Sequence, residues 1–249
     1  DRYTDPGYDG PCNGWPQTIF NLNSGSVPAT SECVDHVLGL YDGNLNVADD
    51  AVRLIVEALR RRPTWDNTVV LVTSDHGEAF MEHGRIGHNA SLYAEMLHVP
   101  FVLRMPGDFD VSGIDTGGLA TLADIVPTLL LSAGVVPPRL TDGVDLMDRS
   151  LNRSGRFMVG RTATTQPVFG VRTLRWNLMV NPAGSGGLFN VATDPDETRN
   201  LVGDHPEIYA GLGKILASRI ALPPQLNAAE TSDLSDEERE LLETLGYVR

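Results

Sequence analysis

Apolar residues recur at spacings of mostly three and four between residues 34 and 59, as on one buried face of an amphipathic helix. A hydroxyl of Thr30 or Ser31 can accept a hydrogen bond from the first turn, and Pro63 follows three arginines that suit the negative end of the helix dipole. The sequence therefore predicts one long helix whose buried positions are Val34, Val37, Leu38, Tyr41, Leu45, Val52, Ile55, Val56 and Leu59. Residues 1–30, which are rich in Gly, Pro, Asn and Asp, are predicted to be loop.

Two short apolar runs, residues 68–73 and 99–104, have the composition of strands buried on both faces, as in a parallel sheet. The stretch between them is rich in loop-forming residues and contains four of the six histidines. A further helix is predicted over about residues 119–133, with Asp124 near its start and Pro127 in its first turn, where no N–H is needed.

The pattern changes after residue 150. Short alternating segments near 157–161, 168–172, 176–180 and 187–190 are separated by turn residues and predict a small antiparallel sheet. A helix is expected over about 206–222, and a capped, charged helix over 235–245. We therefore expect a larger α/β domain over residues 1–150 and a smaller subdomain over residues 151–249.

Composition excludes some classes of protein. No apolar run approaches the ~18–20 residues that a membrane-spanning helix needs, and a formal net charge of −14 disfavours nucleic acid as a partner. Cys12 and Cys33 lie 21 residues apart and can form a disulfide, as in an exported protein, or remain two free thiols. The chain opens with a loop-like run, which leaves its localisation open.

Asp75 and His76 directly follow the first predicted strand. Ligands bind at the carboxyl ends of strands in open α/β sheets. An adjacent carboxylate and imidazole can offer an oxygen and a nitrogen to a divalent metal. Gly77 permits a tight turn that would aim both side chains at one ion. These residues alone leave two alternatives open, a metal site and a structural pair; His98, beside the second strand, is expected in packing or at the surface.

A series of ordered motifs resembles the sulfatase family of the alkaline phosphatase superfamily. The resemblance covers roughly residues 33–249. Its motifs are TSDHGE at 73–78, EHG at 82–84, GHNASLYAE at 87–95, HVPFVLRMPG at 98–107, DIVPTLL at 124–130, VRTLRWNL at 171–178, LFN at 188–190, DPDE at 194–197 and NL at 200–201. It implies an α/β fold, with an alkaline-phosphatase-like mixed sheet flanked by helices and a small C-terminal antiparallel-sheet subdomain.

The resemblance also implies one divalent cation, usually calcium in sulfatases and manganese or zinc in some phosphate-handling relatives. Asp75 and His76 occupy the positions of two of its ligands. Many sulfatases have asparagine where His76 stands. Histidine there is similar to iduronate sulfatases, choline sulfatases, phosphonate monoester hydrolases and lipoteichoic acid synthases, so sulfate and phosphate esters both remain open.

His88 stands where many sulfatases place a lysine that contacts the sulfate ester. An imidazole can also donate to a sulfuryl oxygen or protonate a leaving oxygen, so His88 is the candidate catalytic residue, with a loop-ordering role as the alternative. His83 is expected in the second shell, orienting a metal ligand, or in a purely structural role. Glu78 is expected to buttress the metal loop or to lie at the surface.

The family nucleophile lies in a Cys/Ser-x-Pro-x-Arg motif whose cysteine or serine becomes formylglycine, and the printed sequence contains no such motif. We therefore expect this chain to be the C-terminal part of an enzyme whose missing N-terminal part carries the nucleophile and two further aspartates. Asp49 and Asp50 lie within the long helix and are expected at its surface. The predicted function is hydrolysis of a sulfate ester; the alternatives are a phosphodiesterase or phosphonate monoester hydrolase, and a non-catalytic module.

Overall fold

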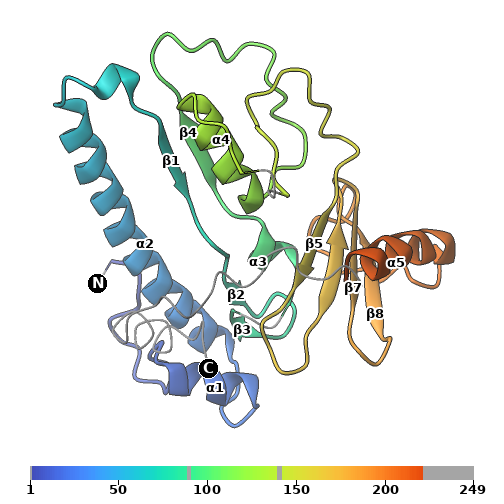
Figure 1. Cartoon of the computed structure of the whole chain (residues 1–249). Coiled ribbons are helices and arrows are strands. Elements are labelled where there is room, and N and C mark those ends of the chain that lie inside the picture. The colour runs from blue at the N-terminus through green and yellow to red at the C-terminus, as the bar shows by residue number, and fades with distance from the viewer. Residues whose placement is uncertain (1, 89–90, 139–141, 221–249) are drawn as a thin grey trace, which may run out of the picture.

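The structure, a computed structural model, describes residues 2–88, 91–138 and 142–220. Figure 1 shows a long helix and a two-stranded ribbon, a short hairpin, and a four-stranded sheet that carries the last described helix. The helices are α1 (Pro16–Asn23), α2 (Ser31–Arg60), α3 (Ala94–Leu97), α4 (Ile125–Ser132) and α5 (Pro206–Ile220), with 3₁₀ turns at Trp65–Asn67 and Leu122–Asp124. The strands are β1 (Val70–Thr73), β2 (Ala79–Phe80), β3 (Ile86–Gly87), β4 (Phe101–Arg104), β5 (Met158–Arg161), β6 (Phe169–Arg172), β7 (Trp176–Val180) and β8 (Gly186–Asn190).

The long helix α2 is confirmed, but its predicted buried face is wrong over most of its length. Thr30 caps the helix by accepting a hydrogen bond from the Cys33 N–H. Cys33 and Val37 in the first turns are buried, whereas Leu45 and Ile55 are 55% and 60% exposed. The difference arises because the described packing partners of α2, the residue 8–27 segment and the β2–β3 hairpin, reach only its N-terminal part.

Strands β1 and β4 form an antiparallel ribbon, with Thr73 opposite Phe101, and the expected parallel arrangement is wrong. A parallel pair needs a long crossover, usually a helix. The described residues between these strands form the β2–β3 hairpin and the four-residue α3 and include no crossover helix. Both strands are half-buried within the described residues, and Val102 is 63% exposed. The antiparallel return brings the loop after β1 beside α3, which precedes β4.

The prediction that residues 1–30 are all loop is wrong, because α1 forms within them. Pro16 occupies the start of α1, where its missing N–H costs nothing. Leu22 packs in a buried cluster with Cys12, Cys33 and Ile86. Cys12 and Cys33 form a disulfide, with their Cα atoms 5.5 Å apart, which decides between the two alternatives that the sequence left open.

The small C-terminal antiparallel sheet is confirmed, in the order β5-β6-β7-β8. Helix α5 packs against it through a core of Val171, Leu178, Leu188, Leu212 and Leu216 (Figure 1). The predicted helix over 235–245 lies outside the described residues. No helix in the described ranges combines the length and apolar character needed to cross a membrane.

A buried ion pair joins the α4 region to the segment that leads into the C-terminal sheet. Asp124 ends the 3₁₀ turn before α4, in a capping box with Thr121, and its side chain is fully buried. Arg156 donates to both carboxylate oxygens at 2.8 Å. Pro127 lies in the first turn of α4, as predicted.

Candidate functional site

The loop after β1 is pressed against the end of α3. The Gly77 N–H donates to the Met96 carbonyl at 2.9 Å. A Cβ on Gly77 would lie 2.0 Å from the Glu95 carbonyl oxygen, which is shorter than any permitted contact. Glycine is therefore needed here for close backbone approach rather than for a positive φ, and it fixes where the preceding Asp75 and His76 lie.

The structure brings the two predicted metal ligands together. His76 Nδ1 lies 2.7 Å from the Gly77 carbonyl oxygen, which can only accept, so Nδ1 carries the proton. His76 Nε2 lies 3.7 Å from Asp75 Oδ2. The two side chains are 37% and 65% exposed, so neither points into packed hydrocarbon.

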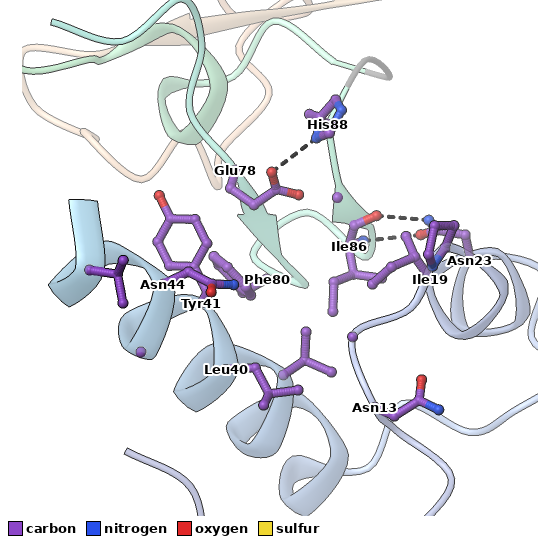
Figure 2. Close-up of a pocket in the computed structure, with 16 residues that line it drawn as sticks. Asn13, Ile19, Asn23, Leu40, Tyr41, Asn44, Glu78, Phe80, Ile86 and His88 are labelled. Carbon is purple, nitrogen blue, oxygen red and sulfur yellow. Dashed lines mark hydrogen bonds and ion pairs between the residues drawn. The ribbon is translucent and has the colours of Figure 1, made fainter. Parts of the chain in front are cut away.

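The β2–β3 hairpin brings Glu78 and His88 to the same place. Ala79 pairs with Gly87, so the residues just outside that pair, Glu78 and His88, lie opposite each other. His88 Nδ1 is 3.0 Å from Glu78 Oε2 (Figure 2). The rings of His88 and His76 stack, with centroids 4.6 Å apart. His76, Glu78 and His88 each place one possible ligand atom within 4.8 Å of the others.

A hollow of about 920 Å³ lies between α1, α2 and the hairpin, and both Glu78 and His88 line it. Figure 2 shows that residues of α1 and α2, Asn13 before α1, and Phe80 and Ile86 of the hairpin also line it. Tyr41 and Asn44 of α2 line it beside Phe80, which meets Tyr41 edge to face. Its volume is in the range of small-molecule sites, so a small organic group can enter beside the candidate residues.

His83, at the hairpin tip, contacts Glu95 and Tyr93. Its Nδ1 is 2.8 Å from Glu95 Oε1, and its ring stacks on Tyr93 at 3.5 Å. Glu95 in turn meets Gly77 through its backbone, so His83 is linked to the loop that carries Asp75 and His76. This indirect position is compatible with the predicted second-shell role, which stays a prediction.

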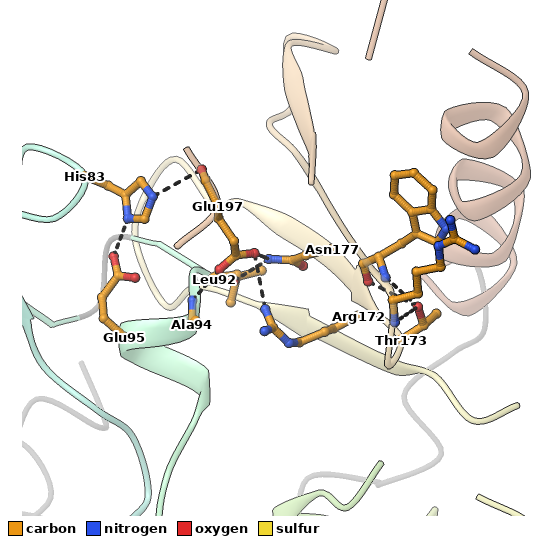
Figure 3. A network of polar contacts seen from close by, with 10 residues as sticks. His83, Leu92, Ala94, Glu95, Arg172, Thr173, Asn177 and Glu197 are labelled. Atoms are coloured by element: carbon orange, nitrogen blue, oxygen red, sulfur yellow. Dashed lines mark hydrogen bonds and ion pairs between the residues drawn. The ribbon is translucent and has the colours of Figure 1, made fainter. Parts of the chain in front are cut away.

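A buried network around Glu197 joins this region to the C-terminal sheet (Figure 3). Glu197 is fully buried and accepts hydrogen bonds from the Ala94 N–H and the Asn177 side chain, each at 2.6 Å. Arg172 of β6 donates to the same carboxylate at 3.2 Å. Asn177 also donates to the Leu92 carbonyl at 2.9 Å, so two side chains of the C-terminal part hold residues 92–94.

Glu197 was part of a sequence motif, but its role was missed because the backbone that it holds, at Ala94, is 103 residues away. Burial, together with the nearby negative charges of Glu197 and Glu95, raises the pKa of Tyr93 above its ordinary value. The phenol therefore stays protonated at neutral pH while it packs against His83.

The remaining sequence candidates are at the surface or in the disulfide. His98 is exposed, as expected. Asp49 and Asp50 are exposed on α2, where Asp50 forms an ion pair with Arg53. Both cysteines are in the disulfide, so neither offers a free thiol.

Comparison with known proteins decides the family. The family model described as Sulfatase matches residues 1–135, more than half of the chain. This chain belongs to the sulfatase family. Arylsulfatase K of Rattus norvegicus is 28% identical over 210 residues, covering 78% of this chain and 37% of that protein. Arylsulfatase K of Danio rerio is 28% identical over 208 residues, covering 78% of this chain and 39% of that protein.

Solved structures confirm the alkaline-phosphatase-like fold that the sequence predicted. A 2-O GAG sulfatase superposes with a TM-score of 0.71 at 23% identity, over 87% of this chain and 54% of that one. Phosphonate monoester hydrolase of Agrobacterium radiobacter superposes with a TM-score of 0.66 at 25% identity, over 83% of this chain and 48% of that one. This sulfatase-family chain thus spans well under two thirds of the curated relatives that it matches.

Proposed function

We propose that this chain forms part of an enzyme that hydrolyses a sulfate ester with the help of one divalent cation. The observation that carries the proposal is the His76–Asp75 pair. The Gly77 carbonyl holds the proton on His76 Nδ1 and turns Nε2 toward the Asp75 carboxylate at 3.7 Å. A ligating histidine commonly donates its other ring nitrogen to a carbonyl in this way.

The donor set fits a divalent cation. Asp75 offers carboxylate oxygen and His76 offers imidazole nitrogen, at an exposed strand end that a substrate can reach. When bound, the cation would polarise the oxygens of the ester. Calcium is the expected ion; manganese and zinc, which accept imidazole more readily, are the alternatives.

His88 is the proposed catalytic residue of this chain. In its protonated form, Nδ1–H donates to Glu78, which leaves Nε2–H to donate to a sulfuryl oxygen or to the departing alcohol oxygen. Glu78 thus orients His88, rather than only buttressing the metal loop. The nucleophile, expected to be formylglycine, is proposed to come from a segment outside these 249 residues.

Calorimetric titration of the chain with calcium, manganese and zinc tests the cation site. We expect His76→Ala to abolish binding, because it removes one ligand, and Asp75→Asn to weaken it, because the negative charge is lost while a carbonyl oxygen remains. His205→Ala is the matched control, since His205 lies against Trp176 at the C-terminal sheet and its loss should leave binding unchanged. Equal binding by His76→Ala and the unaltered chain would contradict the proposal.

A second function, hydrolysis of a phosphonate monoester, is favoured by the 25% identity to phosphonate monoester hydrolase and by histidine at position 76. The enzyme that contains this chain should be assayed with an aryl sulfate and an aryl phosphonate monoester. A larger kcat/KM for the sulfate supports the first proposal, and a larger kcat/KM for the phosphonate supports the second. No turnover of either points to a non-catalytic module.

A further inference from the structure

Helix α1 contacts the hairpin immediately before His88. Asn23, the last residue of α1, donates from Nδ2 to the Ile86 carbonyl at 2.7 Å and accepts at Oδ1 from the Ile86 N–H at 3.0 Å. Figure 2 shows this side chain facing the backbone of β3 from the end of the helix. One amide therefore satisfies both backbone groups of one strand residue.

The hairpin itself cannot satisfy these groups. Met81 donates to the Arg85 carbonyl, so residues 81 and 85 form a hydrogen-bonded pair. Hydrogen-bonded and non-hydrogen-bonded pairs alternate in an antiparallel ladder, so Phe80 and Ile86 form a non-hydrogen-bonded pair. The N–H and C=O of Ile86 consequently point away from β2. Asn23 acts there as a one-residue substitute for a third strand.

A second contact from α1 falls on the next residue. A Cβ on Gly87 would lie 3.1 Å from Ile19 Cγ2, so Ile19 packs directly on the Gly87 backbone, whose φ is +92°. Ile86 is 3% exposed and shares a buried cluster with Leu22 and the Cys12–Cys33 disulfide. Residues 86 and 87 are thus held by α1 through both polar and apolar contacts.

We propose that Asn23 is a positioning residue that fixes the β3 strand and thereby holds His88 against Glu78. The consequence for catalysis rests on the proposed function, in which His88 contacts the ester. The contacts between Asn23 and β3 do not depend on that function. The disulfide anchors the segment before α1 to the start of α2, so α1 approaches the hairpin from a fixed base.

The test uses nuclear magnetic resonance of this chain, without metal or substrate. Three variants are compared with the native chain: Asn23→Leu, which removes both hydrogen bonds but keeps the number and branching of side-chain heavy atoms; Asn23→Asp, which keeps the acceptor and loses the donor; and Asn21→Ala, the control. The Asn21 side chain accepts a hydrogen bond from Gln17, on the same helix, and no other side-chain bond of Asn21 occurs in the part of the chain that the structure describes. The measurements are amide hydrogen exchange at Ile86 and the ring ¹⁵N signals of His88 and His205.

In Asn23→Leu we expect exchange at Ile86 to rise at least ~10-fold, because a protecting hydrogen bond is lost. The His88 signals should shift from the fixed Nδ1–H form toward a mixture of tautomers. Asn23→Asp should give an intermediate effect, and Asn21→Ala none. His205, which contacts Trp176 at the C-terminal sheet, should not change in any variant.

The proposal is overturned if Asn23→Leu leaves His88 unchanged, even if Ile86 exchanges faster, because Asn23 would then stabilise the strand without positioning the histidine. It is also overturned if Asn21→Ala or His205 changes as much. A failure to hydrolyse sulfate esters would defeat the proposed function and leave this result standing.

Discussion

At the residue scale, the candidate site depends on two backbone carbonyls. The Gly77 carbonyl sets the tautomer of His76, and the Glu95 carbonyl forbids a side chain on Gly77. The first contact determines which ring nitrogen faces Asp75, and the second determines where the loop lies. The chemistry of the site therefore depends on Gly77, a residue without a side chain.

Gly77→Ala tests this dependence. A methyl group 2.0 Å from a backbone oxygen must push the loop away from α3. We expect the affinity for a divalent cation to fall at least ~10-fold, as for other changes that misorient a ligand. Gly107→Ala is the matched control, because nothing lies within 4 Å of its new Cβ. Calorimetry on both variants measures the difference; equal affinities would refute the geometric argument.

The buried Glu197 carboxylate is the basis of a second prediction at this scale. Glu197→Gln leaves the half-buried Arg172 without its opposite charge, and we expect the free energy of unfolding to fall by about 3 kcal/mol. Asp204→Asn removes an exposed partner of Arg199 and should cost no more than about 1 kcal/mol. Urea unfolding of both variants gives the comparison. A similar loss of unfolding free energy in the two variants would mean that burial of Glu197 does not strengthen its contribution to stability.

At the scale of elements, three long-range ties hold the site. The disulfide closes a loop over 21 positions and should stabilise the fold by about 3 kcal/mol, mainly by restricting the unfolded chain. Asn23 ties α1 to β3, and Glu197 ties the C-terminal sheet to residues 92–94. Because the last two ties end within a few residues of His88 or Glu95, they restrain the short hairpin and α3, and the disulfide holds the segment before α1 against the start of α2.

The Asp124–Arg156 pair predicts a pH dependence of stability. Burial alone would raise the pKa of Asp124, but hydrogen bonds from Arg156 and from the Val144 and Thr121 amides outweigh it and lower the pKa below its ordinary 3.8. A carboxyl group with a lowered folded pKa stabilises the fold above its unfolded pKa and loses that contribution as pH falls through the folded value.

Asp124→Asn should therefore be less stable than the native chain at pH 7, and the difference should shrink as the pH falls below 3.8. Urea unfolding at a series of pH values measures it. Asp148→Asn is the control: Asp148 also has a lowered pKa, but it is exposed and bonded to Ser150, so only a small difference is expected. A pH-independent difference for Asp124→Asn would contradict the assigned role of its charge.

At the scale of the whole molecule, we predict that this chain by itself does not hydrolyse aryl sulfates or phosphodiesters. The printed sequence has no Cys/Ser-x-Pro-x-Arg motif, and both cysteines are in the disulfide. A candidate cation site and His88 remain, but nothing in the chain matches the family nucleophile. Spectrophotometric assay with a chromogenic aryl sulfate, with and without added calcium, checks this; clear cation-dependent turnover would show that another residue acts as nucleophile.

The sequence predicted most elements correctly where the pattern was long or regular. The helix over residues 31–60 and the four strands of the C-terminal sheet follow from local periodicity, which depends only on neighbouring residues. The α1 helix was missed within a Gly- and Asn-rich segment, although Pro16 followed by Ile19 and Leu22 at helical spacing was a usable signal. The direction of β1 against β4 was also wrong, because strand composition alone does not fix pairing.

The sequence by itself determined the family motifs and the adjacency of Asp75 and His76, because consecutive residues at a strand end cannot lie far apart. Only the tertiary structure decided which nitrogen of His76 faces Asp75, that Glu78 meets His88 across a hairpin, and that Asn23 and Glu197 hold the surrounding backbone. Except for the bond between His76 and the Gly77 carbonyl, these contacts join residues that lie between 10 and 103 positions from each other in the sequence. Contacts at such separations are set by chain folding and packing, and local sequence patterns carry no information about them.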